Sequence, residues 1–236
     1  DAAFFSSQWN KPFSTGIGGF VLANDPNIAQ ALSELESTLP RPARRAATML
    51  QLQLRFRQQL SASRWYWPAV NTYRWLSQKN LINGSSSGGE LTGTEMPEDY
   101  WMGMSTVQAA EGLKQLACFS DNLRHRRQLA DYYQHALAEL GITPVYEPDY
   151  AQHIFLKYPF FVKDKTTFLQ LAHQAQIRLG EWLASPIHPI MPDWQKWGYH
   201  SGTCPVAEQL SRHVLNLPTD PDVSLSAAQQ IVGFLR

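Results

Sequence analysis

The sequence has 236 residues, 44% of them hydrophobic, which is enough for one large or two small globular units with a real core. Twenty basic residues balance twenty acidic ones, so net charge gives no argument for a nucleic-acid partner, and no apolar run reaches the ~20 residues that a membrane-spanning helix requires. Cys118 and Cys204 form no metal or disulfide motif, which favours a reduced, cytoplasmic protein without a metal site.

The first half of the chain is predicted to contain two short strands followed by helices. Residues 1–5 are typical of a buried strand entered partway, so we expect a fragment of a longer chain. A glycine-rich turn leads to a second strand at 20–23, and apolar spacing predicts a helix over 27–39. Residues 43–82 are basic, aromatic and mostly helical by pattern, and the Gly/Ser-rich stretch 83–89 is expected to be a flexible loop.

A long helical tract is predicted over 105–140, where the three- and four-residue apolar spacing is broken only at Arg126 and Gly141 provides a stop. Strands then alternate with helices, which predicts a small α+β domain. The expected elements are a strand over 154–162, a helix capped by Asp164 that runs to Ala175, a strand or loop over 177–183, a helix opened by Thr203 and Pro205 that runs through Leu215, and a last helix with Ser226 and Gln229 as a capping box.

The most informative stretch is residues 5–19, Phe-Ser-Ser-Gln-Trp-Asn-Lys-Pro-Phe-Ser-Thr-Gly-Ile-Gly-Gly. Gly18 and Gly19 carry no Cβ, so Lys11 is expected on a loop against closely approaching backbone. A desolvated lysine has a lowered pKa and can form an imine with an aldehyde, and Ser6 offers a hydroxyl to a phosphate oxygen. On this pattern alone, a surface lysine beside a turn is the commoner case.

Four sequence blocks, in order, resemble the DegT/DnrJ/EryC1/StrS aminotransferase family. Together they are specific, and they cover most of the chain outside residues 40–95. The blocks are Phe5-Ser6 with Lys11 and Thr15-Gly-Ile-Gly-Gly19, then Met104-Ser-Thr-Val-Gln-Ala-Ala-Glu-Gly-Leu-Lys-Gln-Leu116, then Ile187-His188-Pro189, and last Cys204-Pro-Val-Ala-Glu208 with Leu215-Asn-Leu-Pro218 and Pro221.

The resemblance implies an α/β fold, the PLP-dependent transferase fold type I, in which a large domain holds pyridoxal 5′-phosphate (PLP). Residues 1–103 would be the C-terminal part of that large domain, with a helical, basic-aromatic insert. Residues 104–236 would be a linking helix and a small C-terminal α+β domain. The family is similar to enzymes that form homodimers with active sites at the subunit interface.

The same resemblance assigns roles to individual residues. Lys11 would be the catalytic lysine that binds PLP as an imine, Ser6 would hold the cofactor phosphate, and Gly18 and Gly19 would complete the cofactor-binding turn. His188 lies in a loop that is near the substrate site in the family, although a lone histidine is more often structural and we favour that interpretation.

The implied activity is transfer of an amino group from an amino acid such as glutamate to a keto-sugar linked to a nucleotide, a step of nucleotide-sugar and polysaccharide biosynthesis. Some relatives carry a histidine in place of the lysine and dehydrate sugars, and Lys11 argues against that reaction. The expected partners are therefore small-molecule substrates and a second copy of the protein.

Two departures from the family pattern keep other functions open. Trp101-Met-Gly103 stands where the family usually has Asn-Tyr-Arg, whose Asn reaches the PLP phosphate of the partner subunit. The acidic partner of the pyridine nitrogen lies before Asp1 in the family. The chain is alternatively a catalytically inactive remnant that acts as an interaction or scaffold protein. A membrane-surface role for residues 43–82 is a weaker alternative.

Overall fold

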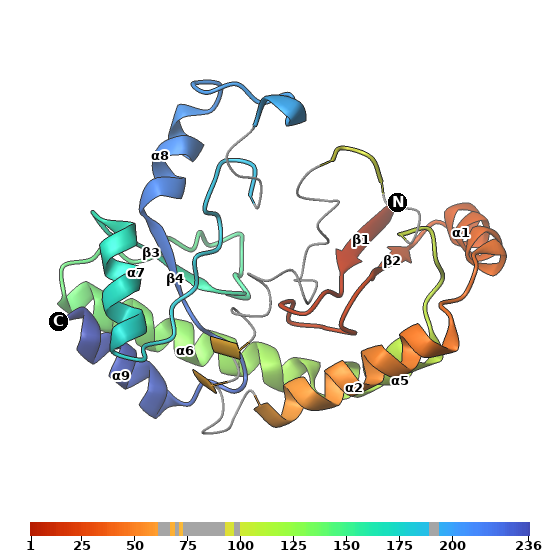
Figure 1. Cartoon of the computed structure of the whole chain (residues 1–236), viewed down its shortest axis with the longest axis horizontal. Coiled ribbons are helices and arrows are strands. Elements are labelled where there is room, and N and C mark those ends of the chain that lie inside the picture. Colours follow the sequence, from red (N-terminus) through yellow and green to blue (C-terminus); the bar gives the residue numbers. More distant parts are fainter. Residues whose placement is uncertain (61–66, 69–70, 73–92, 97–99, 189–193) are drawn as a thin grey trace. The chain divides into compact units, whose positions relative to one another are not determined.

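The computed structural model describes residues 1–60, 67–68, 71–72, 93–96, 100–188 and 194–236, so the predicted loop at 83–89 lies outside the described residues (Figure 1). The chain divides into two compact units, residues 1–90 with 95–120 and residues 91–94 with 121–236. The predicted domain division at 103/104 stays a prediction. The elements are β1 (Ala2–Ser6), β2 (Gly19–Ala23), α1 (Pro26–Thr38), α2 (Arg44–Leu60), α5 (Thr106–Ala117), α6 (Phe119–Glu139), β3 (Tyr158–Phe161), α7 (Lys165–Gln174), η2 (Gln195–Trp197), α8 (Pro205–His213), β4 (Val214–Leu217) and α9 (Leu225–Leu235).

An antiparallel hairpin begins the first unit and confirms the two predicted strands. Strand β1 pairs with β2 from Ala2 opposite Ala23 to Ser6 opposite Gly19. The prediction that β1 is buried is wrong for this chain, because the hairpin is a two-stranded sheet and the Phe4 side chain is 87% exposed. On the hairpin, the rings of Phe5 and Phe20 stack with their centroids 5.2 Å apart.

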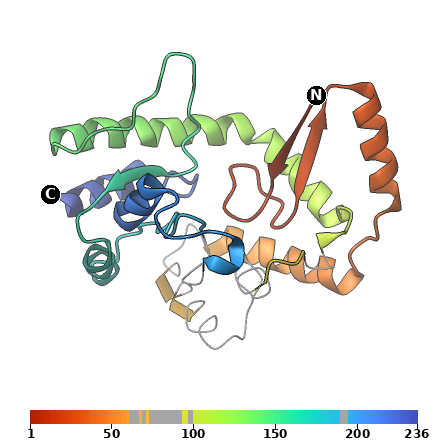
Figure 2. The same cartoon turned by 90° about the horizontal axis from the view of Figure 1, so that it is seen from above.

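Helix α1 begins and ends within one residue of the predicted bounds, and α2 begins one residue after the start of the predicted helical stretch. Asp25 caps α1 by accepting hydrogen bonds from the backbone N–H groups of Asn27 and Ile28, which satisfies two donors that a helix start leaves unpaired. Helix α2 falls inside the predicted helical stretch, and its buried side chains are Leu50 and Leu54, one helical turn apart. It packs against α5 (Figures 1 and 2).

The predicted continuous helical tract over 105–140 is instead two helices. Helix α5 ends at Cys118, whose backbone has left the helical conformation, and α6 begins at the next residue. No Gly or Pro marks this break, but it brings the ring centroid of Phe119 within 6.3 Å of that of Phe13. The predicted stop is confirmed, since Gly141 takes the left-handed φ of 73° that favours glycine.

The second unit encloses one apolar core between helices and a two-stranded sheet. Strands β3 and β4 pair antiparallel, from Tyr158 opposite Leu217 to Phe161 opposite Val214. The arrangement agrees with the predicted mixture of strands and helices (Figure 1). The buried core side chains come from α6, β3, β4, α9 and the loop before α9 and are Leu129, Ala130, Tyr133, Ala136, Leu137, Tyr158, Phe160, Leu215, Leu217, Val223, Ala228, Ile231 and Val232.

Three predicted boundaries in this unit are wrong. The strand predicted over 154–162 is only β3, because Phe155 has a positive φ of 49° that bends the chain out of an extended conformation. The predicted helix through Leu215 ends at His213, and the next residues form β4. The last helix is capped by Ser224, not Ser226, through a hydrogen bond from the N–H of Ala227.

A buried ion cluster replaces apolar packing where Arg126 interrupts the spacing of α6. The Arg126 side chain is 3% exposed, and its Nη2 lies 3.2 Å from a carboxylate oxygen of Asp220. Lys157 Nζ and Arg178 Nη2 lie 2.6 and 2.9 Å from the other oxygen of Asp220, and Arg178 also pairs with Asp222. Arg126 donates further bonds to its neighbours Asn122 Oδ1, Leu156 O and Thr219 Oγ1.

Candidate functional site

Lys11 lies on the loop between β1 and β2, which a ladder of hydrogen bonds closes at its base. The N–H of Ser7 donates to Gly18 O at 2.9 Å, and the N–H of Thr15 donates to Ser7 O at 2.9 Å. The side chains of Ser7 and Thr15 are fully buried and their hydroxyl oxygens lie 2.8 Å apart. Because Thr15 donates its single hydroxyl hydrogen to Ile17 O, Ser7 must be the donor to Thr15.

Lys11 stands at the far end of this loop, on a turn that α2 supports. The N–H of Lys11 donates to Gln8 O at 3.0 Å, which closes the turn. Arg57 of α2 donates to the neighbouring Asn10 Oδ1 at 3.0 Å and lies over the Trp9 ring, 5.5 Å from its centroid. The backbone on either side of Lys11 is therefore held, while its side chain is partly exposed.

Steric constraints within this chain explain why the turn contains glycines. A Cβ on Gly19 would lie 2.5 Å from the carbonyl oxygen of Phe5, and one on Gly16 would lie 2.8 Å from Leu50 Cδ1. Gly16 and Gly18 also have φ values of 93° and 92°, where other residues are strained. Close backbone approach at the Gly-rich turn, expected from the sequence, is therefore present, and contact of Gly18 or Gly19 with a cofactor stays a prediction.

The donor set around Lys11 fits a phosphate-bearing aldehyde. Ser6 ends β1 with an exposed side chain, and among the described residues its Oγ accepts a long hydrogen bond of 3.4 Å from the Gln8 N–H. Its hydroxyl hydrogen is thus available to a phosphate oxygen, five residues before the primary amine of Lys11. Hydroxyl and amine are the two groups of this chain that the sequence assigns to PLP, and those roles stay predictions.

Gln108 connects this loop to the first turn of α5. Its Nε2 donates to Ile17 O at 3.0 Å, while its Oε1 accepts from the N–H and hydroxyl of Ser105 at 2.9 and 2.7 Å. Ser105 in turn accepts from the Gln108 N–H, which completes a capping box. The role of Gln108 was not predicted, although the Ser-x-x-Gln spacing of a capping box is the signal that reveals it.

Arg41 explains the glycine in the segment that departs from the family pattern. Its guanidinium pairs with Glu36 and donates to Met104 O at 3.1 Å. A Cβ on Gly103 would collide with this guanidinium, and the Gly103 N–H donates to Pro40 O at 3.0 Å. A guanidinium from another part of the chain thus fills the space in front of Gly103.

His188 belongs to the second unit and has a structural hydrogen bond. Its Nδ1 accepts from the Ala184 N–H at 3.2 Å, so the neutral ring carries its hydrogen on Nε2. Burial lowers the pKa of His188 below its ordinary value of 6.5, with the nearby charge of Lys165 acting in the same direction. A neutral, backbone-bonded imidazole agrees with the structural interpretation, and contact with substrate stays a prediction.

Glu208, in the Pro-Val-Ala-Glu block, organises the loop before α8. Its carboxylate accepts from the Gly202 N–H at 2.6 Å and from the Tyr199 hydroxyl at 2.8 Å. The Gly202 hydrogen bond, followed by that of Tyr199, lowers the pKa of Glu208 below its ordinary value. The block therefore has a structural role within the second unit.

The described residues contain neither a candidate metal site nor a helix that could cross a membrane. No group of three or more His, Cys, Asp or Glu side chains is arranged to hold a metal ion among them. Within the same residues, every helix is too short or too polar to cross a membrane.

Comparison with known proteins identifies the family. The model of the DegT/DnrJ/EryC1/StrS aminotransferase family matches residues 84–236. The chain is 25% identical over 244 residues to the spore coat polysaccharide biosynthesis protein SpsC of Bacillus subtilis, covering 100% of this chain and 53% of SpsC. The chain thus spans about half the length of this curated relative.

Solved structures show the same fold. The PLP form of the putative sugar aminotransferase Spr1654 from Streptococcus pneumoniae matches 99% of this chain and 50% of its own, with a TM-score of 0.62 and 17% identity. DesI, solved with its TDP-sugar product, matches 100% of this chain and 48% of its own, with a TM-score of 0.60 and 16% identity. The predicted fold class, a part of PLP-dependent transferase fold type I, is confirmed. The chain belongs to the DegT/DnrJ/EryC1/StrS aminotransferase family.

Proposed function

We propose that the protein of which this chain is part is a PLP-dependent aminotransferase. It moves an amino group from an amino acid such as glutamate to a keto-sugar carried on a nucleotide, in polysaccharide biosynthesis. The observation that carries the proposal is Lys11, a primary amine on a loop held by hydrogen bonds, five residues after the exposed hydroxyl of Ser6 in a chain of this family. The names of SpsC and DesI support the sugar substrate.

Two side-chain atoms of this chain would take part in the reaction, Lys11 Nζ and Ser6 Oγ. Lys11 Nζ is the amine that would bond to the aldehyde carbon of PLP and, once displaced by the amino donor, would carry a proton between substrate and cofactor. Ser6 Oγ would donate to the cofactor phosphate. Bound PLP supplies the electron sink for the reaction. The hydrogen bonds at Gln8 and Asn10 fix the backbone from which Lys11 reaches.

Location and partners are part of the same proposal. A protein that consumes nucleotide-linked sugars and free amino acids works where both are made, so we place it in the cytoplasm. It acts as a homodimer, with a second copy contributing to each active site as the family resemblance implies.

Reduction with borohydride tests the role of Lys11. The full-length protein is incubated with PLP, reduced and digested, and the labelled peptide is expected to carry the cofactor on Lys11. Lys11→Ala should abolish both the label and transamination, because no other amine occupies that position on the loop. Lys114→Ala removes an exposed lysine of α5 and serves as the control, with labelling unchanged.

Two outcomes would contradict the assignment. A label on another lysine, or normal transamination by Lys11→Ala, would mean that Lys11 is not the PLP lysine. Failure of the intact wild-type protein to bind PLP at all would favour the inactive, interaction-protein alternative.

A further inference from the structure

We infer that Gln108 is a positioning residue for Lys11, because its side-chain amide fixes the turn that closes the Lys11 loop. The inference rests on the proposed function of Lys11 and adds to it a residue that touches neither substrate nor cofactor. Gln108 is separated from the turn by 91 residues in sequence, yet its Nε2 donates to Ile17 O at 3.0 Å.

The orientation of the Gln108 amide follows from its partners. Ile17 O can only accept, so the group that faces it must be the NH₂. The N–H of Ser105 can only donate, so the group that faces it must be the carbonyl oxygen. Both ends of the amide are therefore used, and a residue at this position must donate on one side and accept on the other.

The site is buried, which makes the loss of this donor costly. Gln108 is 6% exposed, so water has little access to replace a missing hydrogen bond. Ile17 O accepts two bonds, one from Gln108 and one from Thr15 Oγ1 at 3.0 Å. Without the first, Ile17 O, which lies between two glycines of positive φ, keeps one of its two hydrogen bonds, the one from Thr15.

The effect would reach Lys11 through the backbone ladder. The carbonyl of Gly18, next to Ile17, accepts the Ser7 N–H, and Ser7 O accepts the Thr15 N–H. These two bonds define the base of the loop that carries Lys11. Loosening these hydrogen bonds widens the range of positions that the Lys11 amine can take. The imine with PLP would then form more slowly, because its formation requires one orientation of amine and aldehyde.

Gln108→Glu separates this role from helix capping. Glutamate is a preferred residue at the third position of a capping box, so the bond from Ser105 persists and the helix start is kept. An ionised carboxylate cannot donate, so it faces Ile17 O with repulsion in place of a hydrogen bond. Gln53→Glu, on the exposed side of α2, introduces the same charge in the same unit and is the matched control.

Two readouts on the full-length protein test the inference. Amide hydrogen exchange without PLP is expected to be at least ~10-fold faster at Ser7 and Thr15 in Gln108→Glu, as the loss of one buried hydrogen bond predicts. The rate at which PLP becomes reducible by borohydride on Lys11 should fall by a similar factor. Gln53→Glu should match the wild type in both, and lowering the pH should restore the variant, because a protonated carboxyl group can donate to Ile17 O again.

The outcomes distinguish the two proposals. If wild-type protein carries the label on Lys11 while Gln108→Glu shows unchanged exchange and labelling, the positioning role is overturned and the function stands. If the exchange changes but the wild-type label maps elsewhere, the proposed function fails. Should the charged variant not fold, Gln108→Met replaces it, because methionine cannot donate to Ile17 O and leaves this carbonyl with the Thr15 bond. We expect the same faster exchange at Ser7 and Thr15 in Gln108→Met. Exchange at the wild-type rate in that variant would overturn the positioning role.

Discussion

Asp220 pairs with three cationic side chains of the second unit, Arg126, Lys157 and Arg178. Burial by itself would raise the pKa of this carboxyl, but the charges of Lys157 and Arg178 outweigh burial and lower the pKa below its ordinary 3.8. Arg126 shows the reverse balance, since burial lowers the pKa of its guanidinium more than Asp220 raises it. The carboxylate is thus what makes a buried arginine tolerable at this place in α6.

Asp220→Asn should be strongly destabilising, since it leaves Arg126 buried without an opposite charge. We expect a loss of about 3–5 kcal/mol in the free energy of unfolding at neutral pH, measured by urea denaturation. Asp121→Asn is the control, because its pair with Arg124 is exposed and should contribute at most ~1 kcal/mol. Equal effects of the two substitutions would contradict a stabilising role for the cluster.

The stability that Asp220 contributes depends on pH in a defined direction. The folded-state pKa of Asp220 lies below the unfolded value near 3.8, so its ionised form stabilises the fold above that pH. This contribution is lost as the pH falls through the folded-state pKa. The stability difference between wild type and Asp220→Asn should therefore shrink in acid.

Chemistry at single residues was only partly readable from the sequence. Lys11 and Ser6 were found because a motif marks them, whereas Ser7 and Thr15 look like ordinary loop residues and gain their roles from pairing across the loop. Arg126 was visible only as a gap in an apolar pattern. Its partner Asp220 lies 94 residues away, and no local signal joins the two.

Among the elements, the hairpin depends on the absence of a side chain at Gly19. Gly19→Ala would place a Cβ 2.5 Å from the Phe5 carbonyl oxygen, which the paired backbone of β1 cannot move aside. We expect a loss of roughly 1–3 kcal/mol, or a Tm roughly 2–12 °C lower by calorimetry. An unchanged Tm would show that β1 and β2 can move apart enough to fit the Cβ without loss of stability.

Gly233→Ala is the matched control for that substitution. Nothing lies within 4 Å of a Cβ at Gly233, which is in the last turns of α9. Alanine is the better helix former, so this variant should gain about 0.5–1 kcal/mol.

Helices were predicted more accurately than strands because capping residues are local signals. Asp164 and Gly141 each mark a predicted helix end that the structure confirms. The end of α8 was missed because Val214 continues the four-residue spacing of Leu210 while belonging to a buried strand. Either Ser224 or Ser226 could act as the N-cap of α9. Ser224 takes this position because Val223 and Ala228, both in the core, then lie at the two positions of a hydrophobic staple.

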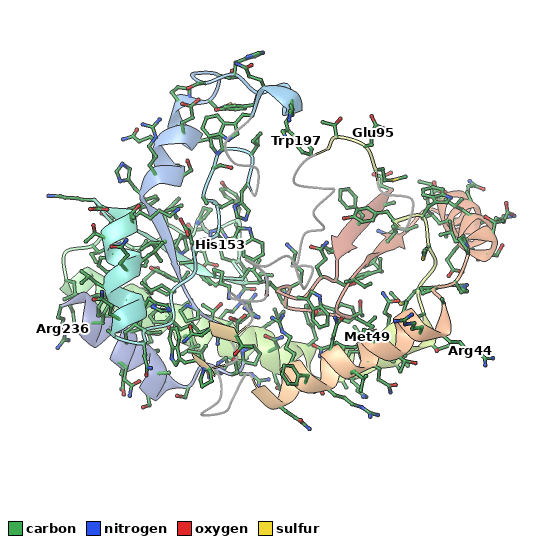
Figure 3. The ribbon with its side chains drawn as sticks, in the orientation of Figure 1. Arg44, Met49, Glu95, His153, Trp197 and Arg236 are labelled. Carbon is green, nitrogen blue, oxygen red and sulfur yellow. The ribbon has the colours of Figure 1, made fainter. Side chains whose placement is uncertain are left out.

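At the scale of the whole molecule, the hairpin exposes an apolar surface. Its exposed large side chains are Phe4, Phe5, Ile17, Val21 and Leu22. The register places Phe4 and Val21 on one face of the sheet and Phe5 and Leu22 on the other, so both faces expose apolar side chains. Exposure of this kind is typical of a surface that another polypeptide covers. On α2, Met49 (Figure 3) is likewise exposed, together with Leu52 and Phe56 at three- and four-residue spacing.

The chain expressed alone should therefore self-associate and should not convert PLP to its amine form with an amino donor. The family resemblance places the acidic partner of the pyridine ring before Asp1, and without it PLP is a poor electron sink. Phe4→Glu combined with Leu22→Lys should reduce association in light scattering, whereas Leu225→Lys on α9 should not. Turnover equal to that of the full-length protein would show that residues before Asp1 are dispensable.

Arg126 also constrains how the second unit is made. Its hydrogen-bond partners at Leu156 and Thr219 follow it by 30 and 93 residues, so a ribosome adding ~5–20 residues per second needs roughly 5–20 s to supply the last of them. Until then the guanidinium of Arg126 stays hydrated, and the apolar face of α6 around Tyr133 stays exposed to water because β4 and α9, which cover it, have not been made. The nascent chain is thus open to chaperones throughout this interval, and the unit folds only after β4 and α9 have been synthesised.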